Sequence, residues 1–193
     1  LDKAAEDFSK LGFDQPVHLG INVPPGYLVG PNAIRKIQLL DRQLSRNKVS
    51  LGVEITERQL IDSEARKCIA ALRVHGIDVL IDDFGTGFST FNYLKQLPAQ
   101  HVKIDGSFVS DMLNDPIDLA LVKAINDISR SLDKRSVAEY VENEEIFFAL
   151  KEIGVDYGQG YFIARPIPVE KVKDELEKIS KNKTFYQQQA SPK

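Results

Sequence analysis

Residues 80–89 read Leu-Ile-Asp-Asp-Phe-Gly-Thr-Gly-Phe-Ser, an apolar run that ends in two adjacent acids and a glycine-bracketed loop. Adjacent carboxylates repel each other. The end of a hydrophobic strand tolerates them only where a cation or a set of hydrogen-bond donors lies between them. Asp82 and Asp83 are therefore the first candidates for chemistry in this chain. The alternative is a solvated turn, because Asp and Gly are ordinary turn residues.

The composition is that of one globular domain, with 193 residues, 42% hydrophobic and 27% charged. The net charge of -3 gives no basic excess for binding a nucleic-acid polymer. The single cysteine, Cys68, excludes an internal disulfide framework and a cysteine-rich zinc site. No signal peptide or apolar membrane span is visible, so we expect a cytoplasmic domain. Because the chain begins on Leu1 and not Met, we expect it to be a piece of a longer protein, whose other domains could anchor it to a membrane.

Short apolar strands alternate with amphipathic helices, a pattern typical of an α/β fold with a parallel sheet. The pattern predicts strands at 16–23, 49–56, 77–83, 102–105, 136–139 and 157–163. It predicts helices at 1–11, 31–47, 62–76, 89–97, 115–132, 143–153 and 168–179. We place one domain over residues 1–180 and expect the polar, Gln-rich residues 181–193 to form a disordered tail.

Polar side chains lie at or just beyond the end of each predicted strand. They are Asn22, Glu54, Glu57, Asp82, Asp83, Lys103, Asp105, Glu139, Glu142 and Gln159. In a parallel barrel the C-terminal ends of all strands open on one face, so these residues would share one rim. Taken singly, each is more often a solvated edge residue, a turn former, a helix cap or a surface lysine. Their recurrence at six strands is what indicates a site.

The chemistry of these side chains favours hard cations. Carboxylate and amide oxygens without thiolates suit magnesium, manganese or calcium. We expect the three histidines, His18, His75 and His101, to be structural or exposed, which disfavours a zinc hydrolase. Two metal ions with bridging carboxylates would form a clamp for phosphodiester hydrolysis. A neighbouring lysine could orient the nucleophilic water or offset developing charge.

With these residues in place, the chain resembles the EAL-domain family, the cyclic-di-GMP phosphodiesterases of bacteria. The matching segments follow the family order over nearly the whole chain and are residues 20–23, 54–57, 82–89, 103–109, 137–142 and 159–166. The Asp-Asp-Phe-Gly-Thr-Gly segment is highly specific, whereas Asn-Val alone would be weak.

The resemblance implies a TIM-like (β/α) barrel with one reversed strand, and a reaction that opens one phosphodiester of cyclic-di-GMP to give linear pGpG. It implies two Mg²⁺ or Mn²⁺ ions, with the ligands Asn22, Glu54, Asp82, Asp83 and Glu139. It gives Lys103 the role of positioning the catalytic water, and Glu57 that of steadying the loop after Asp83. It places three residues on the substrate side or around the site: Gln159, Glu142 and Asp105. It also implies a homodimer and an upstream regulatory or GGDEF-type domain in the parent protein.

The chain departs from the family pattern in four ways. The Glu-Ala-Leu motif of the family lies on the first barrel strand, farther upstream than this chain extends, so we expect a barrel that is incomplete at its N-terminus. Two sheet edges would then need a cover, which could be a separate chain, a domain-swapped neighbour or a shortened fold. Tyr140 replaces a usual glycine, Asn143 a usual threonine and Gly106 a usual arginine. Tyr140 could narrow the site beside Glu139, or it could be a tolerated outward-facing substitution.

Three functions remain open at this point. The first is metal-dependent hydrolysis of cyclic-di-GMP by the parent protein, with the isolated chain weak or inactive because one ligand is missing. The second is a degenerate EAL domain that acts as a non-catalytic cyclic-di-GMP receptor or a protein-interaction module. The third is a structural remnant that binds no ligand.

Overall fold

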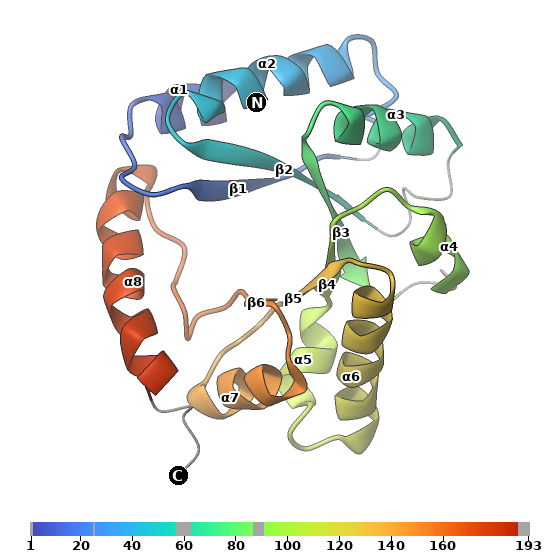
Figure 1. The fold of residues 1–193 in the computed structure, drawn as a ribbon, viewed down its shortest axis with the longest axis vertical. Coiled ribbons are helices and arrows are strands. Elements are labelled where there is room, and N and C mark those ends of the chain that lie inside the picture. Colours follow the sequence, from blue (N-terminus) through green and yellow to red (C-terminus); the bar gives the residue numbers. More distant parts are fainter. Residues whose placement is uncertain (1, 25, 57–62, 87–90, 189–193) are drawn as a thin grey trace.

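The structure is a computed structural model that describes residues 2–24, 26–56, 63–86 and 91–188. Six parallel strands lie in sequence order in one curled sheet, with the helices on its outer side (Figure 1). The strands are β1 (Val17–Asn22), β2 (Val49–Thr56), β3 (Asp78–Phe84), β4 (His101–Ile104), β5 (Arg135–Ala138) and β6 (Tyr157–Gly158). Because each unit adds the next strand to the same sheet, all the strand ends open on one rim, as in a TIM-like barrel. The predicted α/β, TIM-like fold is confirmed as a curled partial barrel.

The helices cover the outer face of this sheet. They are α1 (Asp2–Ser9), α2 (Ala33–Ser45), α3 (Ser63–Val74), α4 (Phe91–Gln96), α5 (Gly106–Asp111), α6 (Pro116–Ser131), α7 (Glu144–Ile153) and α8 (Val172–Gln188), with a 3-10 turn, η2, at Val169–Lys171. No helix among these described ranges is long and apolar enough to cross a membrane.

Local sequence signals begin and end several helices at the predicted positions. The Asp115 carboxylate accepts a hydrogen bond of 2.7 Å from the Ile117 amide and caps α6. The Asn143 side chain accepts a bond of 2.9 Å from the Ile146 amide and caps α7. Gly154, with a φ of 85°, ends α7 in the left-handed conformation that glycine adopts most readily.

The core lies between the sheet and the helices. Strand residues such as Val53, Ile81 and Val102 are fully buried, as are Ile37 of α2 and Ile69 of α3. Each such side chain contributes about 1.5–3 kcal/mol through burial of apolar surface. This packing fixes the strands against one another, so it also fixes the relative positions of the side chains at their ends.

The structure differs from the predicted elements in three places. A short helix, α5, follows β4, where we expected none. Strand β6 ends at Gly158 and not at Ile163, because the chain turns there and the Ile163 amide donates a hydrogen bond of 3.0 Å to the Gly160 carbonyl. Helix α8 continues past residue 180, where we expected a disordered tail, to Gln188. No glycine or proline interrupts the sequence between residues 180 and 191, which allows the helix to propagate.

Helix α8 lies beside the segment that leads into β1, between β1 and α7 (Figure 1). Gln15 donates a hydrogen bond of 3.0 Å to the Ser180 hydroxyl, and Lys173 forms an ion pair of 3.3 Å with Asp14. Within the described ranges, β1 and β6 each pair with only one other strand. The last helix therefore covers part of the side on which the curled sheet remains open.

Candidate metal and phosphodiester site

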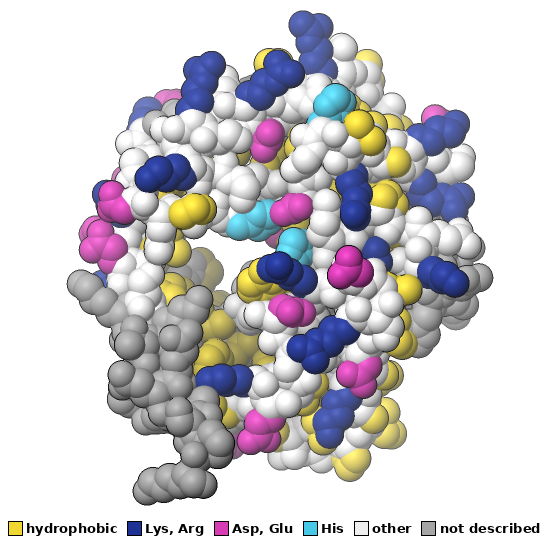
Figure 2. Space-filling model, viewed as in Figure 1, with side chains coloured by type: hydrophobic (Ala, Val, Ile, Leu, Met, Phe, Trp, Pro, Cys, Tyr) yellow, Lys and Arg dark blue, Asp and Glu magenta, His cyan; other side chains and the backbone are white. Residues whose placement is uncertain are grey.

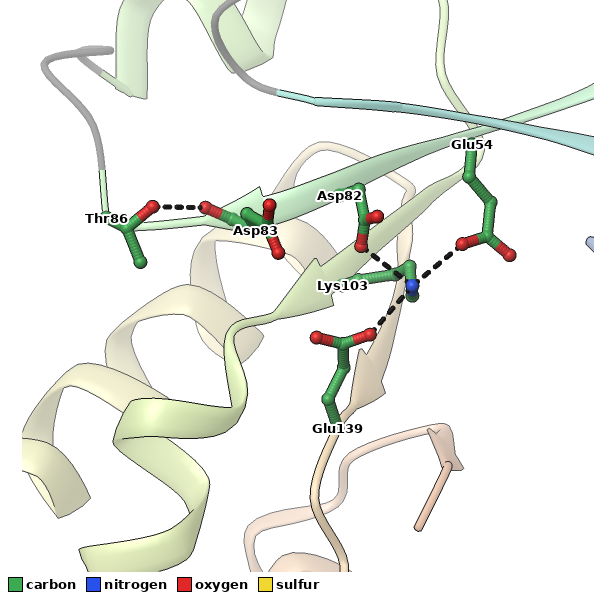
Figure 3. Close-up of polar contacts among 6 residues, drawn as sticks. All are labelled: Glu54, Asp82, Asp83, Thr86, Lys103 and Glu139. Carbon is green, nitrogen blue, oxygen red and sulfur yellow. Dashed lines mark hydrogen bonds and ion pairs between the residues drawn. The ribbon is translucent and has the colours of Figure 1, made fainter. Parts of the chain in front are cut away.

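The Lys103 ammonium group lies at the centre of a cluster of carboxylates (Figure 3). Lys103 is on β4 and only 4% exposed. Its Nζ atom lies 2.7 Å from Asp82 Oδ1, 2.7 Å from Glu139 Oε1 and 2.8 Å from Glu54 Oε2. An ammonium group has three N–H donors, so these contacts use all of them.

Parallel pairing explains why these four side chains meet. Asp82 on β3 pairs with Thr56 of β2, two residues after Glu54, and Lys103 on β4 pairs with Val137 of β5, two residues before Glu139. Residues two apart on a strand point to the same face. Neighbouring strands therefore deliver the four groups to the inner side of one rim.

A local irregularity in β3 brings Asp83 to the same cluster. Side chains of consecutive residues in a regular strand point to opposite faces, so Asp82 and Asp83 could not both reach one site. The pairing of β3 with β4 shifts register between Ile81 and Phe84, and Asp83 has a φ of 54°. The Thr86 hydroxyl donates a hydrogen bond of 3.0 Å to the Asp83 carbonyl and supports this turn (Figure 3). A β-bulge thus re-aims Asp83, a common device beside functional sites.

The donor set fits a hard divalent cation. Carboxylate oxygens of Asp82, Asp83 and Glu139 all lie within 4.8 Å of one another. Two oxygens bound to the same ion are separated by at most about twice the metal–oxygen distance of ~2.0–2.6 Å. The three oxygens are therefore close enough to share one ion without a rearrangement of the backbone.

Burial and mutual repulsion disturb the protonation of this cluster. Burial raises the pKa of Glu139, and the charges of Asp82 and Asp83 add to the increase, while the hydrogen bond from Lys103 opposes it. Burial also raises the pKa of Asp83, and the charge of Asp82 adds to it. For Lys103, burial lowers the pKa, but the hydrogen bonds to the three carboxylates outweigh that effect and raise it. Lys103 therefore remains charged, and its ammonium group contacts three of the four carboxylates.

The raised pKa values of Asp83 and Glu139 predict that divalent-ion binding weakens as the pH falls. Metal ligands must be deprotonated, and carboxyl groups with raised pKa values take up protons at a higher pH than ordinary ones. We expect Mn²⁺ to raise the melting temperature more at about pH 8 than at about pH 5. Thermal melts with and without Mn²⁺ at both pH values measure this difference, and equal shifts at the two values would contradict it.

Four of the other predicted site residues lie at or beyond the ends of strands and differ in exposure. Asn22 is exposed at the end of β1 and pairs in register with Glu54. Asp105 caps α5 by accepting a hydrogen bond of 2.8 Å from the Ser107 amide. Gln159 and Glu142 are exposed. Glu57 lies outside the described residues.

The histidines lie away from this cluster. His18 and His101 are near the beginnings of β1 and β4, at the opposite end of the strands, with their ring centroids 6.0 Å apart. His18 Nδ1 lies 3.0 Å from the Ser50 hydroxyl. Histidine side chains border the hollow in the middle of the face drawn in Figure 2, beside acidic and basic side chains. The cluster at the rim therefore offers oxygen ligands, not imidazole nitrogens.

Comparisons of the chain with protein families and with known sequences give matches that agree with one another. The family model described as "EAL domain" matches residues 1–166 of the chain. The cyclic di-GMP phosphodiesterase PdeB of Shewanella oneidensis is 42% identical over 126 residues, which cover 64% of this chain and 15% of that protein. The chain thus spans a small part of that relative's length.

Solved structures show the same fold. The EAL domain of Mycobacterium smegmatis DcpA has a TM-score of 0.79 at 28% identity, covering 91% of this chain and 81% of that one. The complex of Klebsiella pneumoniae BlrP1 with manganese and cyclic-di-GMP has a TM-score of 0.71 at 30% identity, covering 84% of this chain and 42% of that one. A divalent ion is thus present in a solved relative of this chain.

Proposed function

Since this chain belongs to the EAL domain family, we propose that it hydrolyses one phosphodiester bond of cyclic-di-GMP to give linear pGpG. The observation that carries the proposal is the cluster of Asp82, Asp83 and Glu139, whose oxygens lie within 4.8 Å of one another beside a buried, charged lysine. Hydrolysis of a phosphodiester needs cationic groups around the phosphate, and this cluster provides one cation and ligands for others.

The proposal includes two Mg²⁺ or Mn²⁺ ions. The residues that would hold them are Asn22, Glu54, Asp82, Asp83 and Glu139. When bound, such ions would supply positive charge that polarises the phosphate and makes a nearby water molecule more acidic. The carboxylates also hold negative charge at the rim, which disfavours binding of the anionic substrate until cations offset it.

Lys103 is the residue that links metal binding to substrate binding in this proposal. Its raised pKa excludes it as a general base at neutral pH, so it acts as a charged hydrogen-bond donor. All three donors contact carboxylates in the present structure. One of these carboxylates must first replace its contact with the ammonium group by a contact with another cation. Only then can Lys103 donate a hydrogen bond to water or to a phosphate oxygen.

The wider features implied by the family belong to the same proposal. Gln159, Glu142 and Asp105 would lie around the bound nucleotide, and Glu57 would steady the loop that follows Asp83. We also propose a homodimer, a cytoplasmic location and an upstream regulatory or GGDEF-type domain in the parent protein. Size measurement of the purified chain by light scattering tests the dimer.

The decisive experiment measures product formation from cyclic-di-GMP. We expect the 193-residue chain, in excess over the nucleotide, to form pGpG only slowly with Mg²⁺ or Mn²⁺ and not at all with a chelator. Chromatographic detection of pGpG over several hours measures it, because single-turnover conditions also reveal slow catalysis. Binding of cyclic-di-GMP by calorimetry without any product would favour the non-catalytic receptor instead. Neither binding nor product would contradict both functions.

A further inference from the structure

Tyr140 occupies an unusual position at the rim of this site. It directly follows Glu139, and its φ of 54° lies in the left-handed region that a bulky residue rarely adopts. The residue is 60% exposed. The contacts of a buried core side chain therefore do not explain why a large aromatic residue stands in this strained backbone conformation.

The backbone on both sides of Tyr140 is held in place. The amide of Val141 donates a hydrogen bond of 3.1 Å to the carbonyl of Gln159, and Val141 itself is fully buried. On the other side, the Glu139 amide donates a bond of 3.3 Å to the Ile104 carbonyl, and its carboxylate contacts Lys103. Tyr140 thus projects from an anchored segment and not from a free loop.

The tyrosine ring packs against Gly106, the first residue of α5. A Cβ atom added to Gly106 would lie 2.1 Å from Cδ2 and 2.6 Å from Cγ of Tyr140. Real Cβ atoms do not approach other atoms so closely, so any side chain at position 106 would displace the ring. Gly106 is three residues beyond Lys103, and the ring therefore lies at the rim between the ends of β4 and β5.

These observations describe an aromatic surface that packs against Gly106 and is largely open to solvent. Because Gly106 has no side chain, the ring lies directly against this glycine on one side. Most of the remaining surface of Tyr140 is exposed and can contact a ligand. A ring that is already held in place loses little conformational freedom when a planar group stacks on it. Such a surface recognises planar aromatic groups.

We propose that Tyr140 stacks against a guanine base of the nucleotide whose phosphodiester lies at the carboxylate cluster. This inference rests on the proposed function, because that function places a purine nucleotide at the same rim. Every base presents an aromatic face, so stacking adds affinity without a hydrogen bond to the base. Tyr140 is then a substrate-binding residue, and the chemical step does not use it.

The first test compares the proposed substrate with a phosphodiester that carries no base. Tyr140→Ala is expected to raise KM for cyclic-di-GMP about tenfold, with kcat within about twofold of the wild-type value. Its preference for cyclic-di-GMP over the same cyclic sugar–phosphate ring without the two bases falls by the same factor. Tyr140→Phe keeps the ring and restores the wild-type KM. Gly106→Ala, which displaces the ring, raises KM in the same direction as Tyr140→Ala.

Tyr157→Ala is the matched control. Tyr157 is 44% exposed, and its ring lies beside that of His101 at the beginning of β4, with the ring centroids 5.8 Å apart. We expect this variant to keep the wild-type KM and the wild-type preference between the two phosphodiesters. A loss that occurs equally in Tyr157→Ala and Tyr140→Ala would indicate a general loss of folding and would overturn the inference.

The second test measures stacking without catalysis. The chain contains no tryptophan, so Tyr140→Trp provides a single fluorescent reporter on the proposed surface. Its emission is expected to fall on addition of pGpG and to stay constant on addition of ribose 5-phosphate, which has no base. Tyr157→Trp, with its reporter beside His101, is expected to respond to neither compound.

The outcomes separate this inference from the proposed function. If the wild-type protein cleaves cyclic-di-GMP but Tyr140→Ala keeps both the KM and the preference, the stacking role is wrong and the proposed function stands. If pGpG leaves the emission of Tyr140→Trp unchanged while product still forms, the same conclusion follows. If the wild-type protein neither binds nor cleaves the nucleotide, both are wrong.

Discussion

Lys103→Met is expected to lower the free energy of unfolding by about 3–5 kcal/mol in the absence of divalent ions. The variant keeps a long, unbranched side chain but removes the ammonium group that contacts Asp82, Glu139 and Glu54. The three carboxylates then lose their shared counter-charge, and burial and mutual repulsion act unopposed. Thermal melts in a chelator are expected to show a decrease in Tm of about 10 °C.

Divalent ions should reverse part of this loss, because they supply positive charge to the same oxygens. We expect Mn²⁺ to raise the Tm of Lys103→Met more than that of the wild-type chain. Lys134→Met is the matched control, since Lys134 is also buried but donates hydrogen bonds of 2.7 and 2.8 Å to the carbonyls of Leu97 and Ala99. We expect Lys134→Met to be destabilised as well, but Mn²⁺ should raise its Tm no more than it raises the Tm of the wild-type chain. An equal response of both variants to Mn²⁺ would contradict this account of Lys103.

Asp82→Asn is expected to reduce kcat for cyclic-di-GMP at least about hundredfold at saturating Mn²⁺. The substitution preserves the shape of the side chain but removes one charge from the Asp82, Asp83 and Glu139 cluster. An amide oxygen binds a divalent ion more weakly than a carboxylate, so both the affinity for the ion and its placement suffer. Initial rates of pGpG formation over a range of Mn²⁺ concentrations separate these two effects.

Asp78→Asn is the control for this experiment, because Asp78 lies at the other end of the same strand. Its carboxylate is 3.8 Å from His18 Nδ1 and belongs to no group of described residues that could hold an ion with the rim carboxylates. We expect its kcat to stay within about twofold of the wild-type value. Equal losses in the two variants would show that charge on β3, and not the cluster, determines turnover.

Much of the fold could be predicted from local sequence signals. Strand β2 has the predicted bounds of Val49–Thr56, and the caps at Asp115 and Asn143 begin their helices as expected. These features depend on hydrophobic runs and on side chains that bond to nearby amides, so a short window of sequence contains the information. The gathering of polar residues at the strand ends follows from the same alternation once the strands are parallel.

The features that the sequence did not reveal depend on contacts between distant segments. The bulge in β3 is visible only in its pairing with β4, and it is what allows Asp83 to join Asp82. The chain turns after the short strand β6, where its backbone comes very close to Val141: a Cβ atom at Gly160 would lie 2.3 Å from the Val141 nitrogen. The substitutions at Gly106 and Tyr140 look unrelated in the sequence, and only the structure shows that one makes room for the other.

The sequential strand order has a consequence for when the site forms during folding. Glu54, Asp82, Lys103 and Glu139 each come from a different strand or its end, so the centre exists only when four successive units have docked in register. Such non-local assembly is completed late in folding. A nascent chain that ends before Glu139 would therefore be inert toward a signalling nucleotide, and turnover would report that at least the stretch from Glu54 to Glu139 has assembled.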